Sequence, residues 1–196
     1  MRHNLSEISA IIRDRRTIYP EFFSARKVHE EQIALLLNNA IWAPSHGLTQ
    51  PWRFKVFMDE GRQALSDFLV ETYTDFAGAD IKEMKLARTS QRPLLASAVI
   101  AVAMTPDPKG KIPEIEEIEA VACAVQNMHL TATAHGLGFF WSTPKYIYSG
   151  VCNEFLGLGV KDKLLGFIYI GYPEGDWPKG QRKPIEYVTE WRKSND

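Results

Sequence analysis

Apolar residues in the first half of the chain recur every three or four positions, the period of an amphipathic helix, except in one stretch that alternates like a half-buried strand. Asn4 and Glu7 have the spacing of a capping box, so they open the first helix. Pro44 ends the second helix, because proline cannot continue the helical hydrogen bonds. The pattern predicts, in chain order, a helix over 4–15, a helix over 29–42, a strand over 54–58 and a helix over 61–76.

The second half of the chain contains the most apolar segments. Residues 96–104 are continuously apolar, as expected of a central strand covered on both faces. Residues 114–135 begin with acidic turns and are then apolar nearly all round, which predicts a helix buried against a sheet or a second subunit. Residues 79–92 are polar and weakly periodic, and we expect a mobile flap over a site there. The remaining predictions are a strand over 139–141, a short helix over 150–158, a strand over 165–172 and an irregular arm after Pro173.

The order of these elements predicts an α+β fold with a mixed central sheet flanked by helices and a C-terminal arm. The chain has 196 residues, of which 45% are apolar and 24% are charged. No repeat or linker divides it. We therefore expect one domain over 1–196 with a full-sized core.

The composition excludes several classes of function. The net charge is −1 and the basic residues are scattered, so the sequence shows no basic patch that would bind nucleic acid or anionic lipid. The longest apolar run, 94–104, is too short to cross a bilayer, which takes about 20 residues, and the N-terminus has no apolar signal core. Cys123 and Cys152 have no partner spacing, so we expect buried free thiols and a cytoplasmic protein.

The side chains offer no reaction centre of their own. The five histidines have no paired metal-ligand spacing, and neither cysteine lies in a metal knuckle. His129 and His135 are six apart on the apolar helix, where we expect satisfied core or interface histidines. There is no Gly-x-Ser-x-Gly elbow and no cysteine with an evident base. We expect no catalytic side chain and no metal site, so any catalysis requires a bound organic cofactor.

Three polar segments could hold such a cofactor. The first is Arg15-Arg16-Thr17, where two guanidiniums and a hydroxyl could bind a phosphate. A solvated helix end, where the helix dipole favours cations, explains this triplet better when it is taken alone. The second, Gly136–Thr143, joins a helix to a strand, the reverse of the dinucleotide-binding order. Its hydroxyls, Ser142 and Thr143, could lie against a ring edge, although a plain helix cap explains the glycines.

The third segment is the loop between the second helix and the first strand. Ser45 and His46 offer small hydrogen-bonding groups there. Gln50 precedes Pro51, so we expect its backbone to be extended and its amide to have a fixed direction. Trp52 is expected to anchor the core rather than to stack on a ligand. A plain helix-to-strand connection is an equally good explanation of the loop.

Four motifs follow one another along nearly the whole chain. They are, in order, Arg15-Arg16-Thr17; Ala43-Pro44-Ser45 with Gln50-Pro51-Trp52; Gly136-Leu137-Gly138 before an aromatic strand; and Gly171-Tyr172-Pro173 with Arg182-Lys183-Pro184-Ile185-Glu186. In these motifs and their order the chain resembles the nitroreductase family of FMN-dependent oxidoreductases, especially its compact members. Each motif alone is weak evidence, and the four in order are strong evidence.

The resemblance implies an obligate homodimer with two FMN sites at the subunit interface and a C-terminal arm that wraps the partner. In it, the arginine pair and Thr17 of one subunit hold the phosphate and ribityl chain, with Arg182 or Lys183 as a further cation. The loop at Pro44 of the other subunit lines the flavin, and the end of the aromatic strand meets the ring. The implied cofactor-binding residues are Arg15, Arg16, Thr17, Pro44, Ser45, His46, Gln50, Trp141, Ser142, Thr143, Arg182 and Lys183.

The chain departs from the family pattern at three positions. Thr17 replaces a common serine and keeps the hydroxyl. Tyr19 stands where many members have Lys or Arg near the N1–C2=O edge of the flavin, and Leu48 stands where some carry a polar contact. We therefore expect backbone amides to stabilise the reduced flavin and its redox potential to differ from that of relatives.

The implied function is ping-pong hydride transfer from NADH or NADPH to flavin N5 and on to a nitroaromatic, quinone or similar small-molecule acceptor. Two alternatives stay open. One is a flavoenzyme of the same fold with different chemistry, such as dehalogenation or flavin fragmentation. The other is a non-catalytic flavin-binding protein. The sequence does not distinguish NADH from NADPH.

Overall fold

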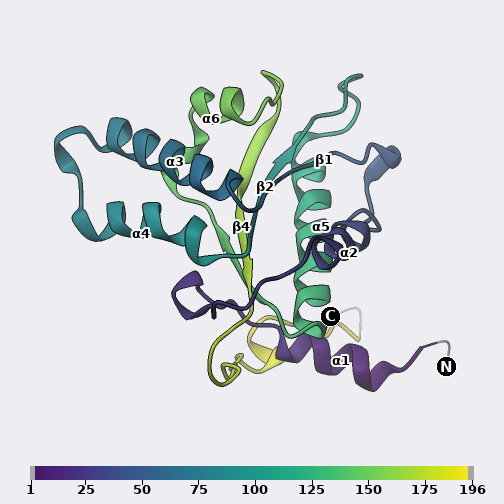
Figure 1. Cartoon of the computed structure of the whole chain (residues 1–196). Coiled ribbons are helices and arrows are strands. Elements are labelled where there is room, and N and C mark those ends of the chain that lie inside the picture. The colour runs from purple at the N-terminus through teal and green to yellow at the C-terminus, as the bar shows by residue number, and fades with distance from the viewer. Residues whose placement is uncertain (1–2, 194–196) are drawn as a thin grey trace.

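The computed structural model describes residues 3–193 and contains one sheet with helices on both faces (Figure 1). The predicted helices and strands are present, with ends that differ by a few residues. The elements are α1 (Leu5–Asp14), α2 (Glu30–Ala40), β1 (Trp52–Phe57), α3 (Gly61–Ala77), α4 (Glu83–Leu95), β2 (Ala98–Met104), α5 (Glu114–Ala134), β3 (Gly138–Ser142), α6 (Gly150–Phe155) and β4 (Lys163–Gly171).

The strands are ordered β1-β2-β4-β3, and all three pairings are antiparallel. The α+β class is confirmed, but the expected mixed sheet is wrong for the strands of this chain. The connections explain the difference. Helices α3 and α4 form a hairpin, so the chain enters β2 from the end of the sheet at which it left β1. The strands β1 and β2 therefore run in opposite directions. Helix α5 makes β2 and β3 run in the same direction, but β4 lies between them, so no two neighbours are parallel.

The central strand β2 carries the core on both of its faces, which explains its unbroken apolar sequence. Ile100 and Val102 pack in a cluster with α2 and α5, whereas Val99 and Ala101 pack in a second cluster with α3, α6 and the segment before it. All seven residues of β2 are buried. Figure 1 shows this division, with α5 and α2 on one side of the sheet and α3, α4 and α6 on the other.

Most of residues 79–92 lies in a regular helix, which the sequence did not predict. Helix α4 covers 83–95 and packs along α3. Its buried residues are Thr89 and Pro93, and neither is scored as apolar in a search for hydrophobic periodicity. The weak periodicity therefore reflects an unusual set of buried residues. The expected mobility of this segment stays a prediction.

Helix α1 begins as predicted, because the Asn4 side chain accepts hydrogen bonds from the backbone N–H groups of Ser6 and Glu7. None of its residues is buried, although it is strongly amphipathic. Leu5 is 62% exposed, and Ile8 and Ile12 are about half exposed. This apolar face lines an open groove with Leu35 of α2 and Leu130 of α5, so the described chain covers it only in part.

The C-terminal arm, described to residue 193, folds back along its own chain. The Trp177 indole N–H donates to the carbonyl oxygen of Asp14 at 2.6 Å, so the arm crosses the end of α1. Its one helical turn is Ile185–Tyr187. The expected contact of the arm with a partner subunit stays a prediction.

The two cysteines differ in burial. Cys152 is buried as expected, but Cys123 is exposed, so the prediction of two buried thiols is wrong. Cys123 lies on the side of α5 that faces away from the sheet cluster formed by Val121, Ala124 and Val125. Within residues 3–193, no helix has the length and apolar character needed to span a bilayer.

Candidate functional site

The predicted phosphate-binding triplet lies beside β3. The Ile18 N–H donates to the carbonyl oxygen of Phe139 at 3.1 Å, which fixes the segment that follows the triplet against the strand. Arg16 Nη1 donates to the carbonyl oxygens of Arg13 at 2.6 Å and Arg15 at 2.7 Å, which ties its guanidinium to the end of α1. Its Nε is buried and has no hydrogen-bond partner in the described chain.

Three guanidiniums gather at this end of α1. Burial, followed by the charges of Arg182 and Arg16, lowers the pKa of Arg15 below its ordinary value. In the part of the chain that the structure describes, none of the three forms an ion pair. Gly180 of the arm lies directly against the Arg16 guanidinium, and any side chain there would collide with it. Mutual repulsion without a carboxylate favours the binding of an anion.

His129 on α5 supports this arginine group and was not assigned a role from the sequence. Its ring stacks on Phe139 with the centroids 4.1 Å apart. Nε2 lies 2.9 Å from the Arg16 carbonyl oxygen, which can only accept, so Nε2 carries the proton. Nδ1 then accepts from Arg15 Nη1 at 3.4 Å. Burial, aided by the charge of Arg15, lowers the pKa of His129 to about 4, so the ring is neutral. The expectation of a satisfied core histidine is confirmed for His129, whereas His135 is exposed at the end of α5.

The end of β3 presents the second predicted group. The Trp141 indole donates to the carbonyl oxygen of Leu165 on β4 at 3.1 Å, so its ring is fixed along the strand pair. Gly166 has a φ of +133°, and a Cβ there would meet the Ser142 carbonyl oxygen at 2.6 Å. Only glycine therefore allows β4 to approach the strand end so closely. Thr143 follows as an exposed residue.

A pocket of about 570 Å³ lies between this strand end and α4. Ser142, Tyr146 and Tyr169 form one wall, and four basic side chains of the α4 segment form the other. Burial raises the pKa of both tyrosines, so their phenols stay protonated and are able to donate hydrogen bonds. The basic wall consists of Lys82, Lys85, Arg88 and Arg92.

Arg92 is a site residue that the sequence did not reveal. Its guanidinium lies 5.6 Å from the Tyr19 ring centroid and 4.9 Å from that of Phe140, and it pairs with Glu21 at 2.9 Å. Tyr19 stands where many members of the resembled family have Lys or Arg. The guanidinium of Arg92, from α4, lies near this position. The only sequence signal was one arginine in a polar segment, which does not identify a site.

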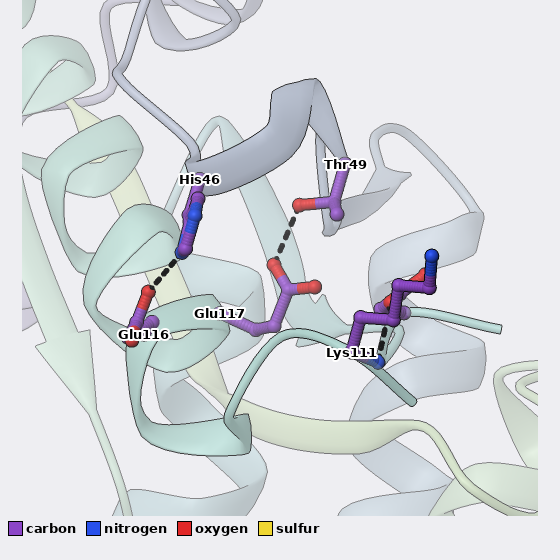
Figure 2. A network of polar contacts seen from close by, with 6 residues as sticks. His46, Thr49, Lys111, Glu116 and Glu117 are labelled. Carbon is purple, nitrogen blue, oxygen red and sulfur yellow. Dashed lines mark hydrogen bonds and ion pairs between the residues drawn. The ribbon is translucent and has the colours of Figure 1, made fainter. Parts of the chain in front are cut away.

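The loop after α2 is held by the first turn of α5 (Figure 2). His46 Nδ1 lies 2.6 Å from a carboxylate oxygen of Glu116, and the Thr49 hydroxyl donates to Glu117 at 2.7 Å. Glu117 is fully buried. Pro44 and His46 are exposed, and Ser45 is half-buried and accepts from the Gln50 N–H at 3.3 Å. These bonds fix the loop while leaving one side of it open.

The prediction of an extended backbone at Gln50 is wrong. Its φ is +48°, and that of Leu48 is +55°, so both lie in the left-handed region that residues other than glycine rarely adopt. The carbonyl oxygen of Gln50 accepts from Arg53 Nη1 at 3.1 Å, and its N–H donates to Ser45. These side-chain hydrogen bonds within the loop outweigh the preference of a residue before proline for extended structure. Trp52 is buried, as expected of a core anchor.

The two predicted halves of the site do not meet within the chain. The loop contacts Glu116 at the start of α5, whereas the arginine pair contacts His129 near its end. Thirteen residues of helix separate these contacts, which is about 20 Å. In the arm, Lys183 Nζ lies 5.6 Å from the centroid of the Tyr187 ring. Of the two arm cations, Arg182 is the one that acts on Arg15.

No cluster of three or more His, Cys, Asp or Glu side chains that could hold a metal ion occurs between residues 3 and 193.

Comparison with known proteins identifies the family. Residues 12–172 match the sequence model of the Nitroreductase family. An Escherichia coli K12 protein named "Putative NAD(P)H nitroreductase YdjA" is 35% identical over 144 residues, which cover 74% of this chain and 77% of that protein.

Solved structures agree in fold. A nitroreductase-like family protein from Bacillus cereus is 29% identical, with a TM-score of 0.81 over 99% of this chain and 100% of that one. A Desulfovibrio desulfuricans protein solved in complex with FMN is 26% identical, with a TM-score of 0.72 over 97% of this chain and 98% of that one. The match confirms the predicted family and fold: the chain belongs to the nitroreductase family of FMN-dependent oxidoreductases.

Proposed function

We propose that this protein is an FMN-dependent NAD(P)H oxidoreductase that reduces nitroaromatics, quinones or similar acceptors. The observation that carries the proposal is the group of Arg15, Arg16 and Arg182, which has no ion-pair partner within the described residues. The FMN complex of the Desulfovibrio relative supports the choice of cofactor. Bound FMN would supply the redox chemistry between the nicotinamide donor and the acceptor, and the residues of this chain would bind and orient it.

The residues present fit the phosphate end of FMN. Arg16 Nε is a buried donor without a partner, and a buried donor of this kind costs about 1–3 kcal/mol unless an acceptor reaches it. A phosphate oxygen is such an acceptor, and Arg15 and Arg182 bring further charge to the same place. Thr17 is exposed beside them and has a hydroxyl for the ribityl chain.

The residues near the strand end fit the ring end of FMN. Trp141, Ser142 and Thr143 lie at the end of β3, beside the pocket, and the segment after the triplet runs along the same strand. We assign Arg92 to the electron-rich N1–C2=O edge, where Tyr19 leaves no cation. This position would stabilise the negative charge of the reduced ring. The expectation that backbone amides alone do so is therefore replaced by a proposal with a named cation.

We further propose that the site is completed in a homodimer by Pro44, Ser45, His46 and Gln50 of a second copy. Two observations support this. The loop and the arginine group are too far apart to act on one flavin within a chain. The apolar face of α1 is exposed, and so is Trp42 next to the loop, at 84%. Since exposed apolar patches of this kind mark interaction surfaces, a second copy is the proposed cover.

The proposal is tested by flavin binding and turnover. Purified protein with added FMN should be yellow, and NADH or NADPH should be oxidised steadily when a nitroaromatic or quinone is present. FMN should bind more tightly than riboflavin, which lacks the phosphate. Arg15→Gln should remove most of that difference, on the order of tenfold or more, because a charge-assisted hydrogen bond is lost. Arg13→Gln, an exposed neighbour on α1, is the matched control.

Three outcomes separate the candidate functions. A protein that stays colourless with FMN refutes the cofactor. Tight FMN binding without nicotinamide oxidation makes the chain a flavin-binding protein instead. Turnover restricted to dehalogenation or flavin breakdown assigns the chain to the other chemistry of the fold.

A further inference from the structure

The α4 side of the pocket carries a row of positive charge, of which the proposed FMN site uses only Arg92. Lys82, Lys85 and Arg88 follow each other at intervals of three residues, and Arg92 comes four residues later, so all four lie on one face of the helix. All four line the pocket, together with one acidic residue, Glu83. The face therefore keeps a positive balance.

The charges in this row differ in how far they are neutralised. Arg92 is paired with Glu21 at 2.9 Å, and Arg88 Nε is 3.8 Å from the same carboxylate. Among the described residues, Lys82 and Lys85 form no ion pair. The Lys85 Nζ instead lies 4.8 Å from the Tyr73 ring centroid and 5.5 Å from that of Tyr146. Aromatic faces hold an ammonium in place without cancelling its charge, so Lys85 is positioned and available to an anion.

The length of the row indicates the kind of anion. From Lys82 to Arg92 the helix rises about 15 Å, which is more than a single carboxylate can span. The Arg92 end lies against Tyr19 and Phe140, near the proposed ring of FMN, and the Lys82 end lies away from it. In Figure 1 the corresponding end of α4 is next to the sheet, and its start is at the edge of the molecule. A ligand that fits has a flat group at one end and several negative charges some distance away.

We propose that Lys82, Lys85 and Arg88 bind the phosphate groups of the nicotinamide dinucleotide that donates the hydride. The ring of that donor lies in the pocket toward Arg92, and its pyrophosphate extends along α4. This inference rests on the proposed function, since it assigns a site to the donor of that reaction. The row would act equally on NADH and NADPH through the pyrophosphate, and the extra phosphate of NADPH would add to its effect.

The test compares a charged and an uncharged donor on the FMN-loaded protein. Anaerobic stopped-flow absorbance follows the reduction of bound flavin by NADH, by NADPH and by 1-benzyl-1,4-dihydronicotinamide, which has the same reactive ring and no phosphate. The variant Lys82→Gln/Lys85→Gln should lower the second-order rate constants for NADH and NADPH on the order of tenfold and leave that for the uncharged donor unchanged. Added salt should slow the two dinucleotides in the wild type only.

Lys161→Gln, an exposed lysine in the turn before β4, is the matched control and should behave as wild type. Arg88→Gln provides a second, independent variant, and the absorbance of bound FMN reports whether each protein is folded. Equal slowing of all three donors would overturn the inference, because the row would then be structural. An effect confined to reoxidation by 4-nitrobenzoate, with 4-nitrobenzamide unaffected, would also overturn it, because the row would then bind the acceptor. If no donor reduces wild-type flavin, the proposed function itself fails.

Discussion

The neutral state of His129 makes the stability of this fold depend on pH. In the folded chain its pKa is lowered from 6.5 to about 4, chiefly by burial. A base whose pKa is depressed by folding stays neutral in the native state while the unfolded state binds the proton. Its contribution to stability is therefore complete above pH 6.5 and is lost as the pH falls from 6.5 toward 4. The shift of about 2.5 units corresponds to about 3 kcal/mol in full, of which about 2 kcal/mol is lost by pH 5.

The geometry indicates what protonation disrupts. Nδ1 accepts from Arg15 at 3.4 Å, and a proton on Nδ1 would replace that bond with two facing donors that both carry positive charge. The Nε2–H bond to the Arg16 carbonyl oxygen could remain. Acid should therefore loosen Arg15 first, and with it the proposed phosphate site.

The variant His129→Gln isolates this effect, because the amide of glutamine supplies a donor and an acceptor but does not titrate. Urea unfolding of both proteins without added FMN, at about pH 7.5 and about pH 5, gives the free energy of unfolding in each state. The wild type should lose about 2 kcal/mol more than the variant over this interval, and all other titrating groups cancel in the difference. Parallel losses in the two proteins would refute the assignment of a neutral, buried histidine.

Three further predictions concern other parts of the fold. Gly166→Ala should lower the free energy of unfolding by about 1–3 kcal/mol, because the added methyl group strains a positive φ and collides with β3, and thermal unfolding measures the loss. Ile8→Asp on the exposed face of α1 should convert a dimer to monomers in sedimentation, whereas Val160→Asp, at a fully exposed position away from α1, should not. Thr49→Val should cost about 1–3 kcal/mol in urea unfolding, since it leaves the buried Glu117 carboxylate without its donor.

The elements predicted from hydrophobic periodicity are present because burial and sequence agree in them. Strand β2 is apolar and buried along its whole length. Helix α5 covers the segment that its acidic first turns and apolar remainder predicted to be a helix. Helix α4 shows where this reasoning fails, because its inward face consists of Leu86, Thr89 and Pro93, and only one of these is a strongly apolar residue. Hydrophobic periodicity also does not predict the order of the strands, because long-range packing decides that β4 lies between β2 and β3.

The candidate site was predictable only where its residues are neighbours in the sequence. Arg15, Arg16 and Thr17 form one motif, and in the part of the chain that the structure describes Arg16 Nε is buried and has no hydrogen-bond partner. Arg92 could not be predicted, because its nearness to Tyr19 depends on how α4 lies against the sheet. The backbone of Gln50 was predicted wrongly, because the preference of a residue before proline pointed to the opposite conformation, and side-chain hydrogen bonds from Arg53 and to Ser45 accompany the observed one.

The separation of the two polar groups along α5 also explains why each motif was ambiguous. A binding site that is complete within one chain brings its residues together on folding, and each then explains the presence of the others. Here the loop at His46 and the arginines at His129 contact the same helix about 20 Å apart, so neither accounts for the other within the subunit. In a dimer with twofold symmetry, the loop of one copy can face the arginines of the other. The same residues that are half a site in each chain would then form two whole sites, and Ile8→Asp should weaken FMN binding together with dimerisation.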